Sequence, residues 1–330
     1  MKRIYHLLTL GLVALLLAGL VACRPAPTPV PPTPTPPPPP TATPTPVPPT
    51  PTPSLYPMTV TDMAGREVTI PAEPQRIVSL APSITEILYA LNLGDRVAGV
   101  TEFCNYPPEA TEKPKVGGFS DVSTEKLLEA QPDLVIVASI HIAQVVPELE
   151  KLGLPVLVVD AHDFPGVLES IRLVGKVTGT EKAAGALTAQ MQERADQVTQ
   201  AVAGRPRPRV YWELDSTLWT VGPGSFVQDL IERAGGENIA ANAEAAWVQL
   251  SAEAIIAADP EIIFLADHPF GESAETVKAR PGWEKISAVV NGRIVELTQE
   301  QGDMVSRPGP RVVDALELIA RALHPDAFQP

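Results

Sequence analysis

Four aromatic residues lie at positions in the sequence where an α/β protein usually forms a binding site. Aromatic residues make up only 5% of the chain, so their positions are informative. Each of the four falls in a segment expected to be a loop, at the end of a strand or just before a helix, where α/β proteins meet their ligands. Flat aromatic faces bind broad, partly apolar ligands, although packing into the core is the alternative for any one of them. The four are Phe103, Phe119, Trp219 and Trp247, and Tyr106 is a weaker candidate.

Two glutamates occupy equivalent places in segments that are 128 residues apart. Ser123-Thr124-Glu125 and Ser251-Ala252-Glu253 each open an expected helix that leads through a proline turn into an apolar strand. A carboxylate in the first turn of a helix is stabilised by the helix dipole by about 0.3–1 kcal/mol, which alone could account for either glutamate. The repeat favours two lobes of similar construction, each with one glutamate at a helix start.

The sequence lacks the clustered residues of metal sites and hydrolases. Beyond the N-terminal segment, the histidines are too widely spaced for a zinc or manganese receptor. There is no Gly-x-Ser-x-Gly motif, no phosphate-binding glycine loop and no HExxH pair. We therefore expect no catalytic residues, no metal ligands and no cofactor. A bare metal-ion receptor and a secreted hydrolase remain less favoured alternatives. The histidines are His141, His162, His268 and His324.

The N-terminal segment has the pattern of an export signal. Two basic residues precede an apolar run from Leu7 to Ala22, which is short for a stable membrane span. The run ends in Leu20-Val21-Ala22-Cys23, which resembles the lipobox of bacterial lipoproteins. We predict a signal peptide over residues 1–22 and lipidation of Cys23, with cleavage elsewhere in the segment as the alternative.

The next segment has the composition of an extended tether. Residues 24–57 hold 18 of the chain's 38 prolines and contain neither an acidic residue nor a glycine. Such a segment cannot form a core and favours polyproline II. At about 3.1 Å per residue it could hold a domain up to roughly 100 Å from the membrane. We predict that residues 23–57 are a lipid-anchored stalk on the extracytoplasmic face, either periplasmic or at the cell surface.

The remaining residues, 58–330, form an acidic domain. Three basic residues precede position 58, which leaves 22 of the 25 basic residues against all 39 acidic ones and a charge of about −17. That charge argues against nucleic acid and anionic lipid surfaces as partners. Cys104 is the only cysteine left after lipidation, so no internal disulfide is expected, and we predict a small buried side chain.

The first half of this domain alternates short apolar strands with helical segments, which is typical of a parallel sheet covered on both faces. A predicted hairpin, Thr59–Ile70, comes first. Ser83 and Glu86 fit a capping box that opens a helix ending at Leu91. In the N-terminal lobe, 58–165, the other expected strands are 76–80, 97–100, 134–138 and 156–159, and the other expected helices are 123–130 and 142–152.

A long helix separates this lobe from a second alternation. Residues 181–203 predict a helix of about 34 Å at 1.5 Å per residue, within a connecting segment, 166–204. The predicted fold class is α/β, with two Rossmann-like lobes bridged by a single long helix and a ligand cleft between them. A shorter connecting helix is expected over 166–177. In the C-terminal lobe, 205–330, the expected strands are 210–214, 262–265 and 294–297, and the helices are 225–234, 251–258 and 309–323.

Short motifs in a fixed order carry a family resemblance from about Thr59 to Pro325. They are Gly65 to Val68, Arg76 to Ser83 with Thr85-Glu86, Tyr106 to Glu109, Val116 to Phe119, Lys126 to Val137, Gly235 to Asn238 and Arg307 to Arg311. Their order and spacing resemble the iron-chelate and cobalamin class of substrate-binding proteins of ABC importers. The Tyr-Pro-Pro, Gly-Gly-Phe and Ser-Arg-Pro-Gly-Pro-Arg stretches are most similar to the cobalamin-binding branch.

The resemblance implies a cargo and partners. The expected cargo is a corrinoid, a cobalamin-like metal chelate that is transported rather than kept as a cofactor. A ferric siderophore or haem is the alternative within the class, although siderophore sites usually carry more basic residues than this acidic domain. The expected partners are an ABC permease with its ATPase subunits and the membrane through the lipid anchor. We expect a monomer and no enzyme activity.

The resemblance also implies roles for single residues. It places the four aromatic residues at the cleft, and it aligns Asp303 and Arg307, in a loop expected before the last helix, with polar cleft residues. An arginine can donate to amide or carboxylate oxygens and an aspartate can accept from amide nitrogens. A surface ion pair is the alternative. One glutamate on each lobe, here Glu125 and Glu253, is implied to dock into arginine pockets of the permease.

Overall fold

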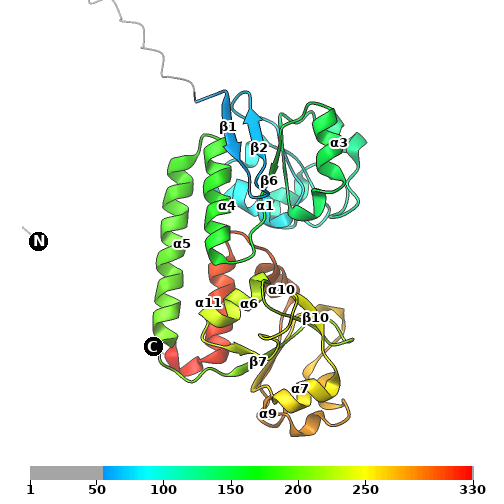
Figure 1. Cartoon of the computed structure of the whole chain (residues 1–330), viewed down its shortest axis with the longest axis vertical. Helices are drawn as coiled ribbons and strands as arrows, with labels where there is room; N and C mark the ends of the chain where they lie inside the picture. Colours follow the sequence, from blue (N-terminus) through cyan, green and yellow to red (C-terminus); the bar gives the residue numbers. More distant parts are fainter. Residues whose placement is uncertain (1–54, 329–330) are drawn as a thin grey trace, which may run out of the picture. The chain divides into compact units, whose positions relative to one another are not determined.

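The computed structural model describes residues 55–328, which form two α/β lobes (Figure 1). The predictions for the signal peptide, for Cys23 and for most of the stalk lie outside the described residues. The N-terminal lobe has a sheet of four parallel strands in the order β4-β3-β5-β6. These strands are β3 (Ile77–Ser79), β4 (Val97–Val100), β5 (Leu134–Val137) and β6 (Val156–Val158).

The C-terminal lobe repeats this arrangement. Its parallel strands follow the order β9-β7-β11-β12, so in each lobe the first strand lies between the second and the third, and the fourth lies at the edge. The predicted fold class of two α/β lobes is confirmed. The strands are β7 (Arg209–Glu213), β9 (Glu237–Asn238), β11 (Ile262–Leu265) and β12 (Ile294–Glu296).

The sequence repeat corresponds to one structural unit in each lobe. The hydroxyls of Ser123 and Ser251 accept hydrogen bonds from the third backbone N–H of their helices, α2 (Thr124–Glu129) and α7 (Ala252–Ala258). Each helix leads into a strand, β5 or β11, whose four residues are all buried, as apolar strands in covered parallel sheets are. The predicted repeat is confirmed.

Two arginines extend the repeat beyond what the sequence indicated. The Arg76 Nε atom donates to the carbonyls of Ala130 and Gln131, at 3.1 and 3.0 Å, where α2 ends. In the C-terminal lobe the Arg209 Nε atom donates to the carbonyls that end α7, those of Ala258 and Asp259, at 3.1 and 2.8 Å. Each guanidinium therefore binds the negative end of the equivalent helix.

The other N-terminal elements mostly follow the prediction. The predicted hairpin is confirmed, with β1 (Met58–Thr61) antiparallel to β2 (Glu67–Ile70). The predicted capping box is wrong, because α1 (Pro82–Ala90) has Ala81 at its N-cap, Pro82 at its start and no side-chain cap. The predicted helix over 142–152 is shorter, α3 (Val145–Lys151). Three 3-10 turns complete the lobe: η1 (Gly94–Arg96), η2 (Pro108–Glu112) and η3 (Ser139–His141).

Two antiparallel helices, α4 (Phe164–Val177) and α5 (Glu181–Val202), join the two sheets along the chain, and α5 is the one that runs along both lobes (Figure 1). The buried residues of α5 recur at intervals of three and four, which gives one apolar face. The helix packs against α4 on one lobe and α11 (Val312–Leu323) on the other (Figure 1). One cluster of buried apolar side chains runs from β5 through α4 and α5 to α11, so the lobes share a core. The exact lobe boundaries stay predictions.

The C-terminal lobe contains elements that the sequence analysis missed. A two-stranded antiparallel ribbon joins β8 (Trp219–Val221) and β10 (Trp247–Gln249). The remaining elements are α6 (Phe226–Arg233), η4 (His268–Phe270), α8 (Ala274–Lys278), η5 (Trp283–Lys285), α9 (Ser287–Val290), α10 (Gln299–Ser306) and η6 (Pro325–Ala327).

Among the described residues, no helix combines the length and the apolar character that crossing a membrane would require.

Candidate functional site

Segments that follow the strands of one sheet contact segments that follow the strands of the other. The Asn105 amide, in the loop after β4, donates to the Asp303 carboxylate in α10, which follows β12. After β6, the backbone N–H of Phe164 donates to the Asp229 carboxylate in α6, at 2.8 Å. The carboxyl ends of both sheets therefore face the boundary between the lobes, where α/β proteins bind ligands.

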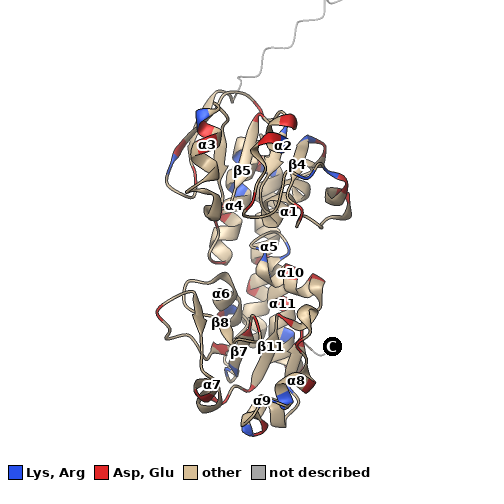
Figure 2. Cartoon of the chain, turned by 90° about the vertical axis from the view of Figure 1, so that its right-hand side faces the viewer, with Lys and Arg blue, Asp and Glu red and all other residues tan. Residues whose placement is uncertain are grey.

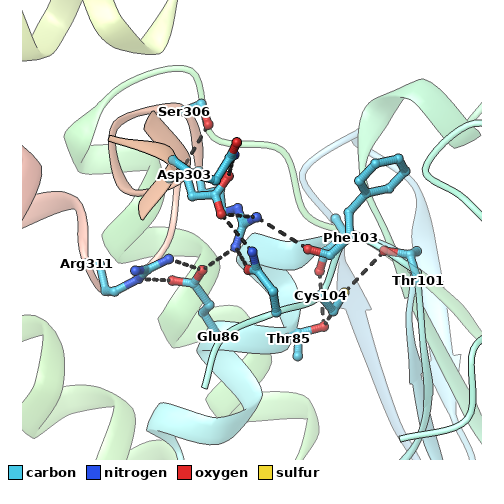
Figure 3. A network of polar contacts seen from close by, with 12 residues as sticks. Thr85, Glu86, Thr101, Phe103, Cys104, Asp303, Ser306 and Arg311 are labelled. Atoms are coloured by element: carbon cyan, nitrogen blue, oxygen red, sulfur yellow. Dashed lines mark hydrogen bonds and ion pairs between the residues drawn. The ribbon is translucent and has the colours of Figure 1, made fainter. Parts of the chain in front are cut away.

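A buried ion cluster joins the lobes at this boundary (Figure 3). Glu86, on α1 of the N-terminal lobe, is 3% exposed. Its carboxylate accepts two hydrogen bonds from Arg311, at 2.9 and 2.7 Å, and one from Arg307 at 3.2 Å. Two charge-assisted bonds from one guanidinium fix the geometry as well as the charge. Glu86 therefore links the two lobes, and the predicted capping box did not indicate this role.

Arg311 also lies over an aromatic ring. Its guanidinium carbon is 3.9 Å from the centre of the Tyr106 ring, a cation–π contact. The pKa of Arg311 is raised: burial opposes the charge, but the hydrogen bonds and charge of Glu86 outweigh it. Tyr106 is 40% exposed, so one face of the loop after β4 is held by the C-terminal lobe while the side chain still meets solvent.

The predicted polar pair, Asp303 and Arg307, is brought together. Arg307 Nη2 lies 2.9 Å from Asp303 Oδ2, and their side chains are 11% and 15% exposed. The expectation of a loop was wrong, because Asp303 lies within α10 and Arg307 follows its last residue. Arg307 is the C-cap of α10, four positions after Asp303, and its guanidinium lies against the Asp303 carboxylate.

Both members of this pair reach the other lobe. Arg307 Nη1 donates to Asn105 Oδ1 at 2.7 Å, and Nη2 donates to the Phe103 carbonyl at 3.3 Å. The Asn105 amide donates to Asp303 Oδ2 at 2.8 Å. The pair is therefore not the surface ion pair that the sequence left open, and Asn105 is a member of the site that the sequence analysis missed.

The two predicted tryptophans lie on the ribbon and not in loops. In the register of this ribbon Trp247 lies opposite Val221, and Gln249 lies opposite Trp219. Residues two apart on a strand point to one face, so the two indoles are diagonal neighbours on the same face. Trp219 is 39% exposed and Trp247 is 56% exposed, far more than the buried Trp212 and Trp283. The ribbon thus presents two tryptophans to solvent.

The predicted aromatics of the N-terminal lobe differ from each other. Phe103 is 57% exposed, and its ring points away from the polar network (Figure 3). Phe119 is partly buried against the core, and its ring meets His141 edge-on with centroids 5.6 Å apart. The His141 Nε2 atom lies 2.7 Å from the Phe119 carbonyl oxygen. The Phe103 ring is therefore open to solvent, whereas the Phe119 ring is held by its contact with His141.

One exposed aromatic was missed. Phe270, in η4 directly after β11, is 83% exposed. Its position after a strand is the signal that singled out Phe103, and it would have been found by the same reasoning. Phe270 adds an apolar group at the carboxyl end of the C-terminal sheet.

The two repeated glutamates are both exposed, in the first turns of α2 and α7. These helices belong to different lobes (Figure 2). Neither the Glu125 nor the Glu253 carboxylate forms a hydrogen bond or an ion pair with another residue between 55 and 328. Both carboxylates are therefore free to meet a partner.

The described residues contain no group of three or more histidine, cysteine or acidic side chains arranged to hold a metal ion. The pair His162 and Asp160 is a single exposed contact at 2.8 Å. Cys104 is buried and free, and the hydroxyls of Thr85 and Thr101 lie 3.2 Å from its sulfur. Its predicted burial is confirmed.

Comparison with known proteins defines the class. Residues 77–301 match the family described as periplasmic binding protein, and the chain belongs to this family. It is 34% identical over 284 residues to YvrC, an ABC transporter substrate-binding lipoprotein of Bacillus subtilis, covering 83% of this chain and 88% of the relative. The predicted family resemblance is confirmed.

Two further similarities concern the ligand. The chain is 32% identical to a cobalamin-binding protein of Halobacterium salinarum, over 82% of this chain and 74% of the relative. It also resembles the solved structure of a periplasmic haem-binding protein of Roseiflexus, with a TM-score of 0.68 and 28% identity, covering 77% of this chain and 99% of that one. The relatives are named as binding proteins and not as enzymes.

Proposed function

We propose that this chain captures a corrinoid outside the cytoplasm and delivers it to an ABC permease. The observation that carries the proposal is the kind of side chain that the two lobes offer a ligand. Exposed aromatic faces occur on both lobes, that of Phe103 on one and those of Trp219 and Trp247 on the other, and a polar pair at the lobe boundary can both donate and accept. A corrinoid is broad and partly apolar, carries amide side chains and brings its own metal, so its receptor needs no metal ligands.

Further features support an importer component tethered to the membrane. The signal peptide would direct export, and the lipidated Cys23 and the stalk of 23–57 would keep the two lobes near a permease. Glu125 and Glu253 would each dock onto one half of a permease with two-fold symmetry, because each lobe offers an exposed carboxylate at the same place in the repeated unit. A monomer suits this geometry, since each lobe then contacts a different half.

A haem or ferric siderophore is the second candidate, favoured by the structural similarity to the haem-binding protein of Roseiflexus. The lobe boundary supports it less well. The cluster there has two carboxylates, Glu86 and Asp303, for its two arginines, so no cation is left over for a ligand carboxylate.

The test is calorimetric titration of the purified protein with cyanocobalamin, haemin and a ferric hydroxamate in parallel. We expect binding of cyanocobalamin, and a weakening of roughly 10- to 100-fold in Trp247→Ala, because a central aromatic anchor carries 1–3 kcal/mol or more. Val290→Ala, at an exposed apolar position in α9, is the control and should leave the affinity unchanged. Tight binding of haemin or the hydroxamate, without binding of cyanocobalamin, would overturn the ligand assignment.

A further inference from the structure

The loop after β4 places a carboxamide of the protein itself on the polar pair. The Asn105 carbonyl oxygen accepts from Arg307 Nη1 at 2.7 Å, and its NH2 group donates to Asp303 Oδ2 at 2.8 Å. One amide thus uses the arginine as a donor and the aspartate as an acceptor at the same time. A primary carboxamide offers both kinds of group, an acceptor oxygen and an NH2 donor, and Asn105 uses one of each here.

We propose that the Asn105 side chain occupies the position of a ligand carboxamide. When a ligand that bears primary carboxamides binds, the Asn105 side chain leaves Arg307 and Asp303, and a carboxamide of the ligand takes its place. The inference rests on the proposed function and goes further, because it names the chemical group that the pair selects and the residue with which a ligand competes.

Exposure and anchoring make this exchange feasible. Asn105 is exposed, whereas the side chains of Arg307 and Asp303 are 11% and 15% exposed, so the asparagine covers the pair from the solvent side. Its neighbour Cys104 is 1% exposed and contacts two threonine hydroxyls at 3.2 Å. The loop backbone is therefore held, and a change of the Asn105 side-chain rotamer is enough to free the pair.

The other bonds of Arg307 survive the exchange. Without Asn105, Arg307 still donates to Glu86, to Asp303 and to the Phe103 carbonyl. The guanidinium therefore stays in place, and one Nη1 donor and one Asp303 oxygen become available together. The pair is preorganised, which limits what a ligand must order on binding.

The charges explain why an amide suits this position better than a carboxylate. Two arginines and two carboxylates balance in the cluster of Glu86, Asp303, Arg307 and Arg311. A ligand carboxylate would add an unbalanced negative charge and could not donate to Asp303. A neutral carboxamide satisfies both partners, so the pair discriminates against acidic ligands by an unfavourable contact as well as by a favourable one.

The test compares Asn105→Ala with the wild-type protein in titrations with cyanocobalamin. Removal of the competing amide should tighten binding by about 3- to 10-fold, since two hydrogen bonds no longer have to be exchanged. Asn291→Ala, at an exposed position that ends α9, away from α10, is the matched control and should not change the affinity (Figures 1 and 2). Where the wild-type protein binds cyanocobalamin, unchanged or weaker binding by Asn105→Ala overturns the inference.

A second measurement separates this inference from the proposed function. The side-chain NH2 signals of Asn105, assigned by their loss in Asn105→Ala, are followed by NMR while propionamide or propionate is added to the wild-type protein. Propionamide should shift them towards solvent-exposed values and propionate should not. That result supports the exchange even if cyanocobalamin does not bind, which would refute the proposed function alone. Equal responses to the two probes refute the exchange.

Discussion

The two lobes have the same framework but differ in what they place on it. Both have the same strand order. In both, a capped helix leads into a buried strand, and an arginine donates hydrogen bonds to the carbonyls at the end of that helix. The N-terminal lobe adds the hairpin of β1 and β2 and the clamped loop after β4. The C-terminal lobe adds the tryptophan ribbon and the helix α10. The differences lie in segments that follow strands, and these segments form the candidate site.

The interiors differ as well. Glu213, at the end of β7, has no exposed side chain and pairs with Arg280 at 2.6 Å, while the equivalent place in the N-terminal lobe is taken by the apolar, buried Leu80. Arg280 also pairs with Glu272 at 2.9 Å and lies 4.6 Å from the centre of the Trp283 ring. One framework therefore tolerates an apolar or a charged interior, provided that the charge is paired.

The first prediction tests whether the repeat serves docking, and it has the largest expected effect. Reversing both charges, by Glu125→Arg with Glu253→Arg, should lower uptake in a reconstituted importer by at least about tenfold, because two arginine pockets would then face cations. Affinity for the ligand should not change, since neither glutamate belongs to the ion cluster, the polar pair or the exposed aromatic faces of the candidate site.

Single reversals sharpen this comparison. Glu125→Arg and Glu253→Arg should each weaken uptake to a similar degree, because the lobes would contact equivalent halves of the permease. Glu129→Arg, at another exposed position of α2, is the control. Undiminished uptake by the double variant would show that the helix dipole is the whole reason for these glutamates.

The second prediction concerns the charged interior of the C-terminal lobe. Asp267, which follows β11, is 3% exposed, and no other described residue donates a hydrogen bond to its carboxylate. Burial, and then the neighbouring charge of Glu213, raise the pKa of Asp267 to about 7. Glu272 acts in the same direction, while Arg280 opposes it.

The sign of the pH dependence follows from this raised pKa. The unfolded chain releases the Asp267 proton near pH 4, whereas the folded protein keeps it until about pH 7. The protonated group therefore stabilises the folded protein below pH 4. As the pH rises from 4 to 7 this contribution is lost, and the free energy of unfolding falls by up to about 4 kcal/mol. Asp267→Asn should therefore unfold at higher urea concentration than the wild type at pH 8, with a smaller difference at pH 4. Asp121→Asn, at an exposed position, should show no such trend, and a trend equal to that of Asp267→Asn would contradict the assignment.

The third prediction tests the equivalence of the two frameworks and has the smallest effect. Arg76→Met and Arg209→Met each remove hydrogen bonds to the carbonyls that end α2 or α7. Each should lower the free energy of unfolding by about 1–2 kcal/mol in urea denaturation. Arg172→Met, at an exposed position of α4, is the control. If only one of the two variants lost stability, the two arginines would not be equivalent.

Local patterns in the sequence predicted most of the framework. The apolar runs that became β5 and β11, the serines that cap α2 and α7, and the helix α5 were all located from residues close together in the chain. Such features depend on helix caps, on periodicity and on turn residues. The ribbon of β8 and β10 was missed because its strands are three residues long and are separated by the 25 residues between Val221 and Trp247.

The sequence by itself determined the acidic two-lobed α/β class, the repeated helix and strand, and which exposed aromatics to examine. Only the tertiary structure decided what Glu86 and Asn105 do. The spacing to Ser83 suggested that Glu86 caps a helix, yet its partners Arg307 and Arg311 come from the other lobe, more than 200 positions away. A helix cap depends on neighbours within one turn, whereas a buried charge takes whichever opposite charge the packing of the whole chain brings to it.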